Sequence, residues 1–303
     1  MIELGVKVTI GVCVKDSEKT IEMALRSVFA QDFPHESIEI VIVDDGSTDQ
    51  TLSLVKILAS SADIKTRIYH HSWKGIAFSR QVVVDNARSK YLIWVDSDYE
   101  LRTDFVRQHV GFMESNPDVG VASGQEVTGG ETLVAFLESV SALPDNPKQI
   151  NVVDVGGAIY RVEAIKDAGG FDEELKGAGE DVDLTNRMKK TQWRLSEDQA
   201  QFYHRHRKTW KALWSEYRWW GYGMHYVTHK HHCRFALVNI PLIAMAIAVK
   251  RMPKLYKGDR GKRIFLLPLH SFLKHAAWCF GFMESHVSGH GHEKVWLTKN
   301  RQK

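Results

Sequence analysis

Cysteine is scarce in this chain. Its 303 residues include three cysteines, which lie far apart in the sequence (Cys13, Cys233 and Cys279). No pair has the close spacing of a zinc-binding or redox motif, so the sequence predicts neither a disulfide framework nor a cysteine zinc site, and a reducing compartment suits it. The first residues also lack the basic start, apolar run and small-residue cleavage site of a signal peptide. We therefore expect the protein to remain in the cytoplasm.

Long hydrophobic runs are also missing. A bilayer-spanning helix needs about 20 mainly apolar residues. Residues 235–249 are apolar but few and contain Pro241, whereas residues 264–282 have the length but contain His270, Lys274 and His275. Both segments suit helices that lie in a membrane interface, because basic residues and tryptophan flank them. They equally suit core helices that pack on the rest of the protein, and the sequence leaves both interpretations open.

Positive charge is in deficit in the first two-thirds of the chain and in excess in the last third. Residues 1–203 contain 21 Lys and Arg against 33 Asp and Glu, whereas residues 204–303 contain 19 against 4. Such asymmetry indicates an acidic partner for the basic segment, either an anionic membrane surface or a nucleic acid. A solvated basic face is the alternative. The sequence contains no motif that reads DNA or RNA, so a membrane surface is the favoured partner and a nucleic acid is not expected.

Strand-like and helix-like stretches alternate through the first hundred residues. Short apolar runs rich in β-branched residues occupy 8–14, 38–43 and 91–95, as expected for strands covered on both faces. Apolar residues recur at helical spacing from Ser17, and helices are also expected at 51–58 and 76–88. This alternation predicts βαβ units and therefore an α/β domain with a mostly parallel sheet.

Acidic residues gather where these strands end. Asp44 and Asp45 follow the second strand, and Asp96-Ser97-Asp98 follows the third. Ligands of open α/β sheets bind beyond the carboxyl ends of the strands, so we expect the two clusters to line one crevice. An Asp-x-Asp at this place suits a hard divalent cation such as Mg²⁺ or Mn²⁺ that bridges the protein to a diphosphate. The alternative interpretation is a polar loop without a ligand.

A third acidic group lies in the segment GAGEDVDLTNRM (177–188). Glu180 and Asp181 open a predicted helix after two glycines. A carboxylate at this place can remove a proton from an acceptor hydroxyl. Helix capping is the alternative, because the N-terminus of a helix favours negative charge.

Asp44 is similarly open to two interpretations: it accepts a hydrogen bond from a nucleotide base, or it belongs to a strand–turn–helix of structural value only.

Five segments occur in one order and at sensible spacing: VTIGVCVKDSEKTI, IEIVIVDDGSTDQT, YLIWVDSD, GGFDEEL and GEDVDLTNRM. Together they resemble glycosyltransferase family 2 over roughly residues 6–206. The resemblance implies a GT-A fold, with a Rossmann-like sheet and helices on both faces. We expect this catalytic domain at residues 1–206 and a helical, basic extension at 207–303. The resemblance also implies sugar transfer by a single displacement with inversion at the anomeric carbon.

The resemblance carries nucleotide and metal roles to particular positions. Asp44 matches the acid that contacts the nucleotide base, and Arg80 matches the position after the loop that lines the nucleotide. Asp96 would contact the ribose or the metal, with Ser97 also at the nucleotide. Asp98 would bind the metal, Mn²⁺ or Mg²⁺, directly.

It also carries roles to the acceptor side. Asp181 matches the catalytic base, and Glu180 stands beside it for sugar or acceptor contacts. Gly156 and Gly157 fall in the segment that lines the sugar and acceptor pocket. A histidine near the metal is expected from FYHRHRKTW (202–210), where either His204 or His206 serves. Strand alternation would put both imidazoles on one side.

The chain departs from the family pattern after its first strand. Pro-Thr-Tyr-Asn is frequent there, and this chain has Cys13-Val14-Lys15-Asp16 instead. Val14 and Asp16 are expected at the nucleotide, but the base stays open between UDP and GDP. The Gln-x-x-Arg-Trp motif of processive synthases is absent from the sequence, which favours transfer of one sugar.

We therefore expect a metal-dependent glycosyltransferase whose partners are a UDP- or GDP-sugar and an acceptor at the inner face of the cell membrane. A polyprenyl-phosphate-linked or other lipid-linked glycan would explain the basic, apolar extension. Two alternatives remain: a soluble transferase that acts on a free glycan, protein or small molecule, and a scaffold that binds nucleotide sugars without turnover.

Overall fold

The computed structural model describes residues 5–127, 129–143, 153–232, 235–256 and 261–288. The chain divides into two compact units. We call Met1–Val127, Asn146–Glu174 and Glu180–Arg205 the sheet unit, and Thr128–Asp145, Leu175–Gly179 and His206–Lys303 the helical unit. The helical unit therefore takes in two segments from within the first 206 residues, besides the basic extension.

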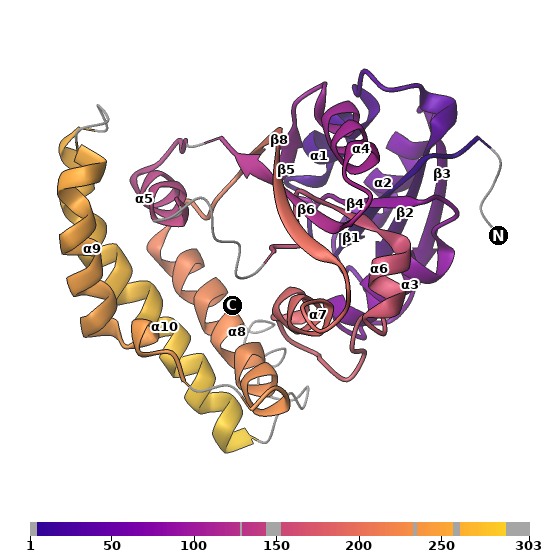
Figure 1. Ribbon diagram of the computed structural model, residues 1–303. Helices are drawn as coiled ribbons and strands as arrows, with labels where there is room; N and C mark the ends of the chain where they lie inside the picture. The colour runs from indigo at the N-terminus through magenta and orange to yellow at the C-terminus, as the bar shows by residue number, and fades with distance from the viewer. Residues whose placement is uncertain (1–4, 128, 144–152, 233–234, 257–260, 289–303) are drawn as a thin grey trace. The chain divides into compact units, whose positions relative to one another are not determined.

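An eight-stranded sheet forms the centre of the sheet unit (Figure 1). The strand order is β3-β2-β1-β4-β7-β6-β8-β5. The strands are β1 (Val8–Val14), β2 (Ile38–Asp44), β3 (Lys65–His70), β4 (Tyr91–Trp94), β5 (Tyr99–Leu101), β6 (Val119–Glu126), β7 (Ala158–Arg161) and β8 (Arg194–His204). The strands expected at 8–14, 38–43 and 91–95 are confirmed as β1, β2 and β4.

The sheet is mostly parallel, as the sequence predicts, and β7 and β5 run in the opposite direction to the other strands. β1 to β4 pair in parallel, because a helix crosses over between each strand and the next. β7, however, lies antiparallel to both β4 and β6, and β5 lies antiparallel to β8. The sequence pattern does not show this change, since β7 is fully buried and reads like any other apolar strand.

Helices cover both faces of the parallel part. One face packs alternate residues of β1 and β2 against α1, α2 and α4 in a single apolar core. On the other face, a side chain at Gly11 would collide with Val83 of α3. The helices of this unit are α1 (Ile21–Phe29), α2 (Thr51–Ser60), α3 (Ile76–Asn86), α4 (Phe105–Ser115), α6 (Val162–Asp167) and α7 (Glu180–Met188), with a 3₁₀ turn at His35–Ser37.

The helical unit contains α5 (Leu133–Ala142), α8 (Trp210–Lys230), α9 (Pro241–Tyr256) and α10 (Leu267–Ser288), with 3₁₀ turns at Leu237–Asn239 and Lys262–Leu266. α8 and α10 lie side by side (Figure 1). The backbones approach so closely that a Cβ at Gly221 would collide with the carbonyl of Trp278, and one at Gly281 with that of Arg218. Glycine at these two positions therefore permits the packing of the two helices.

The polar residues that interrupt the apolar run at 264–282 face inward. Glu138 of α5 accepts hydrogen bonds from the Tyr217 hydroxyl and, at 3.4 Å, from Lys274 Nζ, and the imidazole of His270 lies 2.9 Å from its other oxygen. Although burial raises it, the pKa of the Glu138 carboxyl is held well below its usual range by Lys274, His270 and Tyr217. These residues form a buried ionic network within the helical unit.

Some large apolar side chains of the helical unit are exposed to solvent. Leu237, Leu242, Phe265, Leu269 and Phe280 are exposed large side chains. None of the helices in the described part of the chain combines the length and the apolarity that crossing a bilayer requires.

Candidate active site

The sheet unit places the expected acids at the ends of its parallel strands. Val14 and Asp44 are register partners at the last position of β1 and β2. Asp44 is fully buried, and its Oδ1 accepts hydrogen bonds from the amides of Gly46 (3.1 Å) and Ser47 (3.0 Å) and lies 2.9 Å from His70 Nδ1. Its Oδ2 is buried and has no hydrogen-bond partner among the described residues. A buried carboxylate oxygen without a partner is costly, so this atom is suited to a donor on a ligand.

Asp16 is exposed and adopts a left-handed backbone conformation, with φ 47°. Its Oδ1 accepts from the Thr48 amide at 2.7 Å, which ties the turn after β1 to the turn after β2. Val14 accepts a hydrogen bond from the Asp45 amide through its carbonyl, at 2.9 Å. Both residues therefore shape the end of the β1–β2 pair, beside Asp44.

Arg80 connects two of the predicted acids. It is buried in α3, donates to Glu180 through one guanidinium nitrogen, and donates to Asp96 Oδ1 at 3.2 Å through another. Burial lowers its pKa, but Glu180 and Asp96 raise it well above the ordinary value, so Arg80 stays charged. The chain thus brings residues 80, 96 and 180 together, a grouping that the one-crevice prediction for Asp44, Asp45 and Asp96–Asp98 did not include.

The acids around Arg80 outnumber it, and their pKa values show this. Burial, together with Asp181, raises the pKa of Glu180 to about 7, against the opposing charge of Arg80. The pKa of Asp181 rises to about 6 through burial and then through Asp154. The pKa of Asp154 is raised to about 6, because the surrounding protein desolvates the carboxylate and the negative charge of Asp96 repels it. The side chain nevertheless reaches solvent. Carboxylates with such pKa values are candidates for proton transfer near neutral pH.

Asp98 and His204 meet because β5 pairs with the end of β8, in a register that places Tyr99 opposite His204. The His204 Nε2 atom lies 3.7 Å from Asp98 Oδ2, and Nδ1 lies 3.9 Å from Glu126 Oε2. Burial lowers the pKa of His204, but Asp98 and Glu126 raise it to about 9. His206 is buried and is the first residue of the helical unit.

This donor set fits the expected metal. Carboxylate oxygens and one imidazole nitrogen are ligands that suit Mn²⁺, and carboxylates suit Mg²⁺. Asp98 and Glu126 raise the pKa of the His204 imidazole, so the ring carries a proton near neutral pH. A cation that binds the ring would displace this proton. Within the sheet unit, Asp98, Glu126 and His204 are therefore suited to hold the metal.

Gly156 and Gly157 lie beside the acids, and neither position accommodates a side chain. A Cβ on Gly156 would lie 2.6 Å from Asp96 Oδ2. Gly157 has φ 71°, and its Cβ would lie 2.5 Å from the ring of Phe202. Ser97, by contrast, donates its hydroxyl hydrogen to Ser17 Oγ at 3.0 Å, which connects the Asp-x-Asp loop to the loop after β1.

Two residues of this site escaped the sequence analysis. Asp154 stands two positions before Gly156 and accepts from its amide at 3.2 Å. Glu126 ends β6. Asp154 carries a signal, an acid directly before a buried Val-Gly-Gly, whereas Glu126 ends a strand whose pairing with β8 the sequence does not show.

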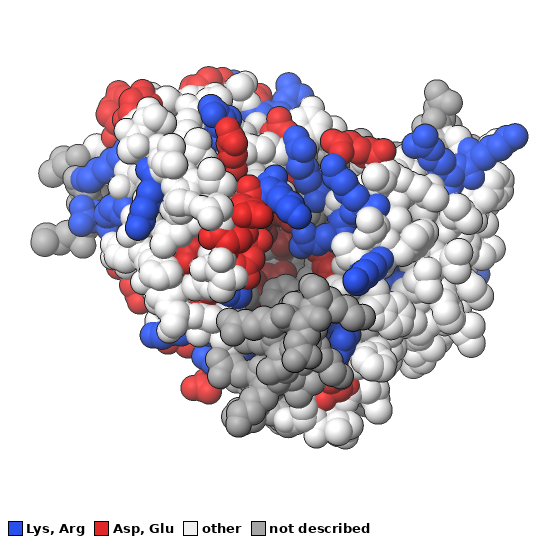
Figure 2. All heavy atoms as spheres, turned by 180° about the vertical axis from the view of Figure 1, so that it is seen from behind, with Lys and Arg blue, Asp and Glu red and all other residues white. Residues whose placement is uncertain are grey.

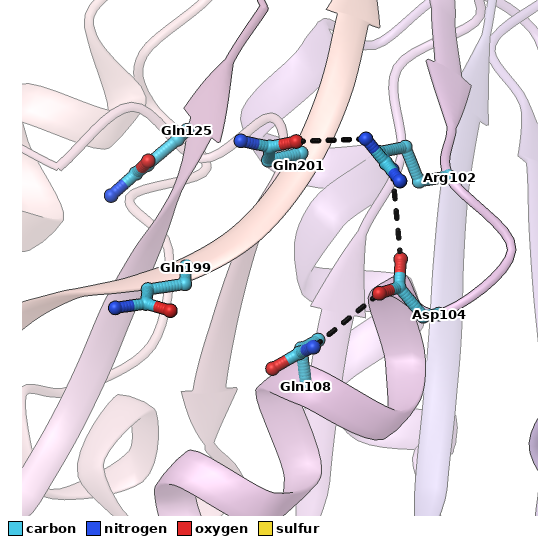
Figure 3. Close-up of a pocket in the computed structure, with 6 residues that line it drawn as sticks. All are labelled: Arg102, Asp104, Gln108, Gln125, Gln199 and Gln201. Atoms are coloured by element: carbon cyan, nitrogen blue, oxygen red, sulfur yellow. Dashed lines mark hydrogen bonds and ion pairs between the residues drawn. The ribbon is translucent and has the colours of Figure 1, made fainter.

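A separate hollow of about 310 Å³ lies elsewhere in the sheet unit (Figure 3). In it Arg102 donates to Gln201 Oε1 at 3.1 Å, and Gln108 donates to Asp104 at 3.3 Å. It is lined by Arg102, Asp104, Gln108, Gln125, Gln199 and Gln201, none of which the sequence analysis singled out. On the face drawn in Figure 2, some Asp and Glu side chains gather near the centre, and others are scattered among Lys and Arg over the rest of that face.

The sequence matches the model of Glycosyl transferase family 2 over residues 9–168, more than half of the chain. The chain belongs to glycosyltransferase family 2. The match covers β1 to β7, and hence Asp44, Arg80, Asp96 and Asp98, whereas α7 and β8 lie beyond it. The resemblance stated from the five segments is thereby confirmed.

The curated relatives match this chain over only part of their own length. Poly(ribitol-phosphate) beta-N-acetylglucosaminyltransferase TarS of Staphylococcus aureus (strain Mu50 / ATCC 700699) is 31% identical over 175 residues, which are 57% of this chain and 30% of TarS. Pre-mycofactocin glycosyltransferase of Mycobacterium tuberculosis (strain CDC 1551 / Oshkosh) is 28% identical over 171 residues, 53% of this chain and 34% of that protein. The chain spans about a third of the length of these relatives.

Solved structures show the fold of this family 2 chain. The mannosyltransferase PcManGT from Pyrobaculum calidifontis, in complex with GDP-Man and Mn²⁺, has a TM-score of 0.65 at 16% identity and covers 93% of this chain and 88% of its own. S. aureus TarS 1–349 in complex with UDP-GlcNAc has a TM-score of 0.54 at 19% identity, with 94% and 92% covered. The expected GT-A fold is confirmed.

Proposed function

We propose that this chain is a metal-dependent inverting glycosyltransferase that moves one sugar from a UDP- or GDP-sugar to an acceptor at the cytoplasmic face of the membrane. The observation that carries the proposal is the group of Asp154, Glu180 and Asp181, whose pKa values are raised beside Arg80 at the strand ends. The nucleotide sugars named with TarS and PcManGT support the donor class, and the Mn²⁺ named with PcManGT supports the metal.

Asp181 is the proposed base. In its ionised form it takes the proton of the acceptor hydroxyl while that oxygen bonds to the anomeric carbon. The bond from this carbon to the diphosphate oxygen breaks, and the nucleoside diphosphate leaves with the electron pair. A pKa of about 6 keeps most of Asp181 ionised at pH 7 and places it closer to neutrality than an ordinary aspartate, which favours proton transfer.

The other residues bind and orient. Asp44 Oδ2 is the proposed acceptor for a base N–H, and Arg80 positions Asp96 and Glu180 through its two hydrogen bonds. Asp98, Glu126 and His204 would hold Mn²⁺ or Mg²⁺, which would neutralise the charge that develops on the leaving diphosphate. Gly156 and Gly157, the proposed lining of the sugar and acceptor pocket, let the backbone lie close against Asp96 and Phe202.

The proposed membrane acceptor rests on the helical unit. Leu242 of α9 and Phe265 are exposed, and Lys250, Lys254, Lys262 and Arg263 are exposed on the same segments. Exposed apolar side chains interleaved with cations suit an interface of anionic lipids. We therefore propose a lipid-linked acceptor, such as a polyprenyl-phosphate-linked glycan, which would lie at that surface.

The experiment for the reaction is release of nucleoside diphosphate from a panel of UDP- and GDP-sugars, with and without Mn²⁺ and with and without a lipid extract. We expect one donor to be used, with release that depends on the metal and increases with lipid. Binding of a donor without hydrolysis or transfer under every condition would contradict catalysis and favour a nucleotide-sugar-binding scaffold.

The membrane part is tested separately, by flotation of the full chain with vesicles of phosphatidylcholine and an anionic phospholipid. We expect Leu242→Glu to reduce flotation. Ile57→Glu is the matched control, since Ile57 of α2 is 65% exposed and Leu242 is 63% exposed. Equal flotation of both variants and the wild type would contradict membrane binding by this surface. The hypothesis of a soluble acceptor would then be favoured over that of a lipid-linked one.

A further inference from the structure

Three imidazoles of the helical unit converge on one point. His225 and His229 stand four residues apart on α8, so they project from the same face of the helix, and His286 comes from α10. The Nε2 atom of His225 lies 3.0 Å from Nδ1 of His286 and 3.1 Å from Nε2 of His229. One ring nitrogen from each residue lies within 4.8 Å of the other two.

Hydrogen bonds among the rings account for this arrangement only in part. A ring nitrogen of a neutral imidazole carries either one hydrogen or one lone pair. The Nε2 atom of His225 faces two other nitrogens but offers either one hydrogen or one lone pair, so it shares that single group between the two contacts. A divalent cation would accept a lone pair from each of the three nitrogens at once.

The spacing and the ligand type indicate which cation fits. Zinc binds imidazole nitrogen at about 2.0–2.1 Å in tetrahedral sites, which separates neighbouring ligand nitrogens by about 3.3 Å. The two shorter separations here, 3.0 and 3.1 Å, are close to that value. Imidazole suits Zn²⁺ and its neighbours Cu²⁺ and Ni²⁺, whereas Mg²⁺ and Mn²⁺ prefer oxygen. This site therefore differs in kind from the acids of the sheet unit.

The surroundings hold one ligand firmly and leave the others accessible. His225 is buried, and its ring packs against His229 and edge-on against Phe282 of α10, at centroid distances of 4.4 and 4.7 Å. His229 and His286 are exposed, so a cation can enter from solvent. Three protein ligands leave a fourth tetrahedral position open, which water fills in other zinc sites of this type.

We propose that His225, His229 and His286 form a zinc site that joins α8 to α10. The site lies on the same pair of helices that Gly221 and Gly281 bring into close contact. Because the three ligands come together only when the two helices are packed, the cation binds the folded unit and stabilises it.

The test is zinc binding to full-length protein that carries no affinity tag, after removal of metals with a chelator. Zn²⁺ is titrated in competition with a chromogenic chelator, and Co²⁺ is added separately to record the visible absorption of a tetrahedral site. We expect one tight equivalent, a Co²⁺ band and a rise in melting temperature with Zn²⁺. His286→Asn removes an exposed ligand and should weaken that equivalent by at least about 100-fold, more than the loss of an outer-shell partner costs.

His232→Asn is the matched control. His232 is exposed just after the same end of α8 and has φ 51°, a conformation that asparagine tolerates. This variant should bind zinc as the wild type does, which separates the site from general binding by a chain with 15 histidines. Metal-free melting temperatures equal to that of the wild type confirm that both variants fold.

Equal zinc affinity and the same Co²⁺ spectrum for the wild type and His286→Asn would overturn the proposal. Asp98→Asn distinguishes the two metal sites. It should abolish Mn²⁺-dependent transfer while it leaves the tight zinc equivalent unchanged, and loss of that equivalent in Asp98→Asn would place the zinc in the sheet unit instead.

Discussion

The carboxylates of the two units have pKa values that are shifted in opposite directions. In the sheet unit, Asp154, Glu180 and Asp181 surround one arginine, and their pKa values are raised to about 6, 7 and 6. In the helical unit, Glu138 has Lys274, His270 and Tyr217 around it, and its pKa is lowered well below the usual range. Acids whose negative charge is not balanced by nearby cations indicate a site that binds a ligand or exchanges a proton. An acid whose charge is balanced by its neighbours indicates a structural role.

The largest effect should come from Asp181→Asn. The amide keeps the shape of the side chain but cannot take a proton, and general-base catalysis contributes about 10²–10⁴-fold. We expect kcat to fall by that factor with the melting temperature nearly unchanged, measured by release of nucleoside diphosphate. The control is Asp63→Asn, an exposed acid beside His35 on the surface of the same unit. Full activity of Asp181→Asn would assign the base to another acid, and Glu180 and Asp154 would be the next to test.

In the helical unit the corresponding change affects stability instead. Glu138→Ala leaves Lys274, whose side chain is 11% exposed, without its counter-charge. Breaking a buried ion pair by removing one partner costs about 3–5 kcal/mol. We expect urea denaturation to show a loss of this size, while transfer at a temperature where the variant is folded stays close to that of the wild type.

Glu131→Ala is a surface comparison in the same unit, since Glu131 pairs with Lys208 and both side chains are exposed. Exposed pairs contribute about 0–1 kcal/mol. Equal losses for Glu138→Ala and Glu131→Ala would show that the network around Glu138 is not the structural counterpart of the catalytic acids.

The same contrast explains what the sequence can and cannot reveal. β1 and β2 were predicted because buried parallel strands read as continuous apolar runs, and Asp44, Asp96 and Asp98 were located because acids follow these runs directly. β8 was missed as a full strand, since polar residues such as the half-buried Glu197 and the exposed Gln199 interrupt its pattern. With β8 missing, the pairing that brings His204 beside Asp98 and Glu126 is not visible in the sequence.

In the helical unit the missing information is long-range. Lys274 interrupts an apolar run in the sequence, but its partner Glu138 lies 136 residues away. The four-residue spacing of His225 and His229 is visible in the sequence, whereas His286 joins them only through the packing of α8 on α10. Neither relation is expressed by local periodicity, so both require the structure.

Acid pH should affect activity through the proposed base. Asp181 must be ionised to accept a proton, and its pKa is about 6, so kcat/KM should fall as the pH decreases through about 6. After burial, Asp154 is the largest cause of this raised value. Asp154→Asn should therefore move the acidic limb of the pH–rate profile to lower pH. An acidic limb at the same pH in both proteins would separate the limb from this pair of carboxylates.

The smallest effect should be a gain in stability in Asp154→Asn. A carboxyl whose folded pKa lies above the unfolded value of about 3.9 binds its proton more tightly when the chain is folded. Ionised Asp154 therefore destabilises the fold at pH 7, and this cost decreases as the pH falls from about 6 towards the unfolded value of about 3.9. Because the side chain reaches solvent, the gain at pH 7 should be less than about 1 kcal/mol, measured by urea denaturation. At pH 4.5 the difference between Asp154→Asn and the wild type should shrink. A loss of stability at pH 7 would mean that the hydrogen bond from the Gly156 amide outweighs the repulsion, and Asp154 would then resemble Glu138 rather than its neighbours.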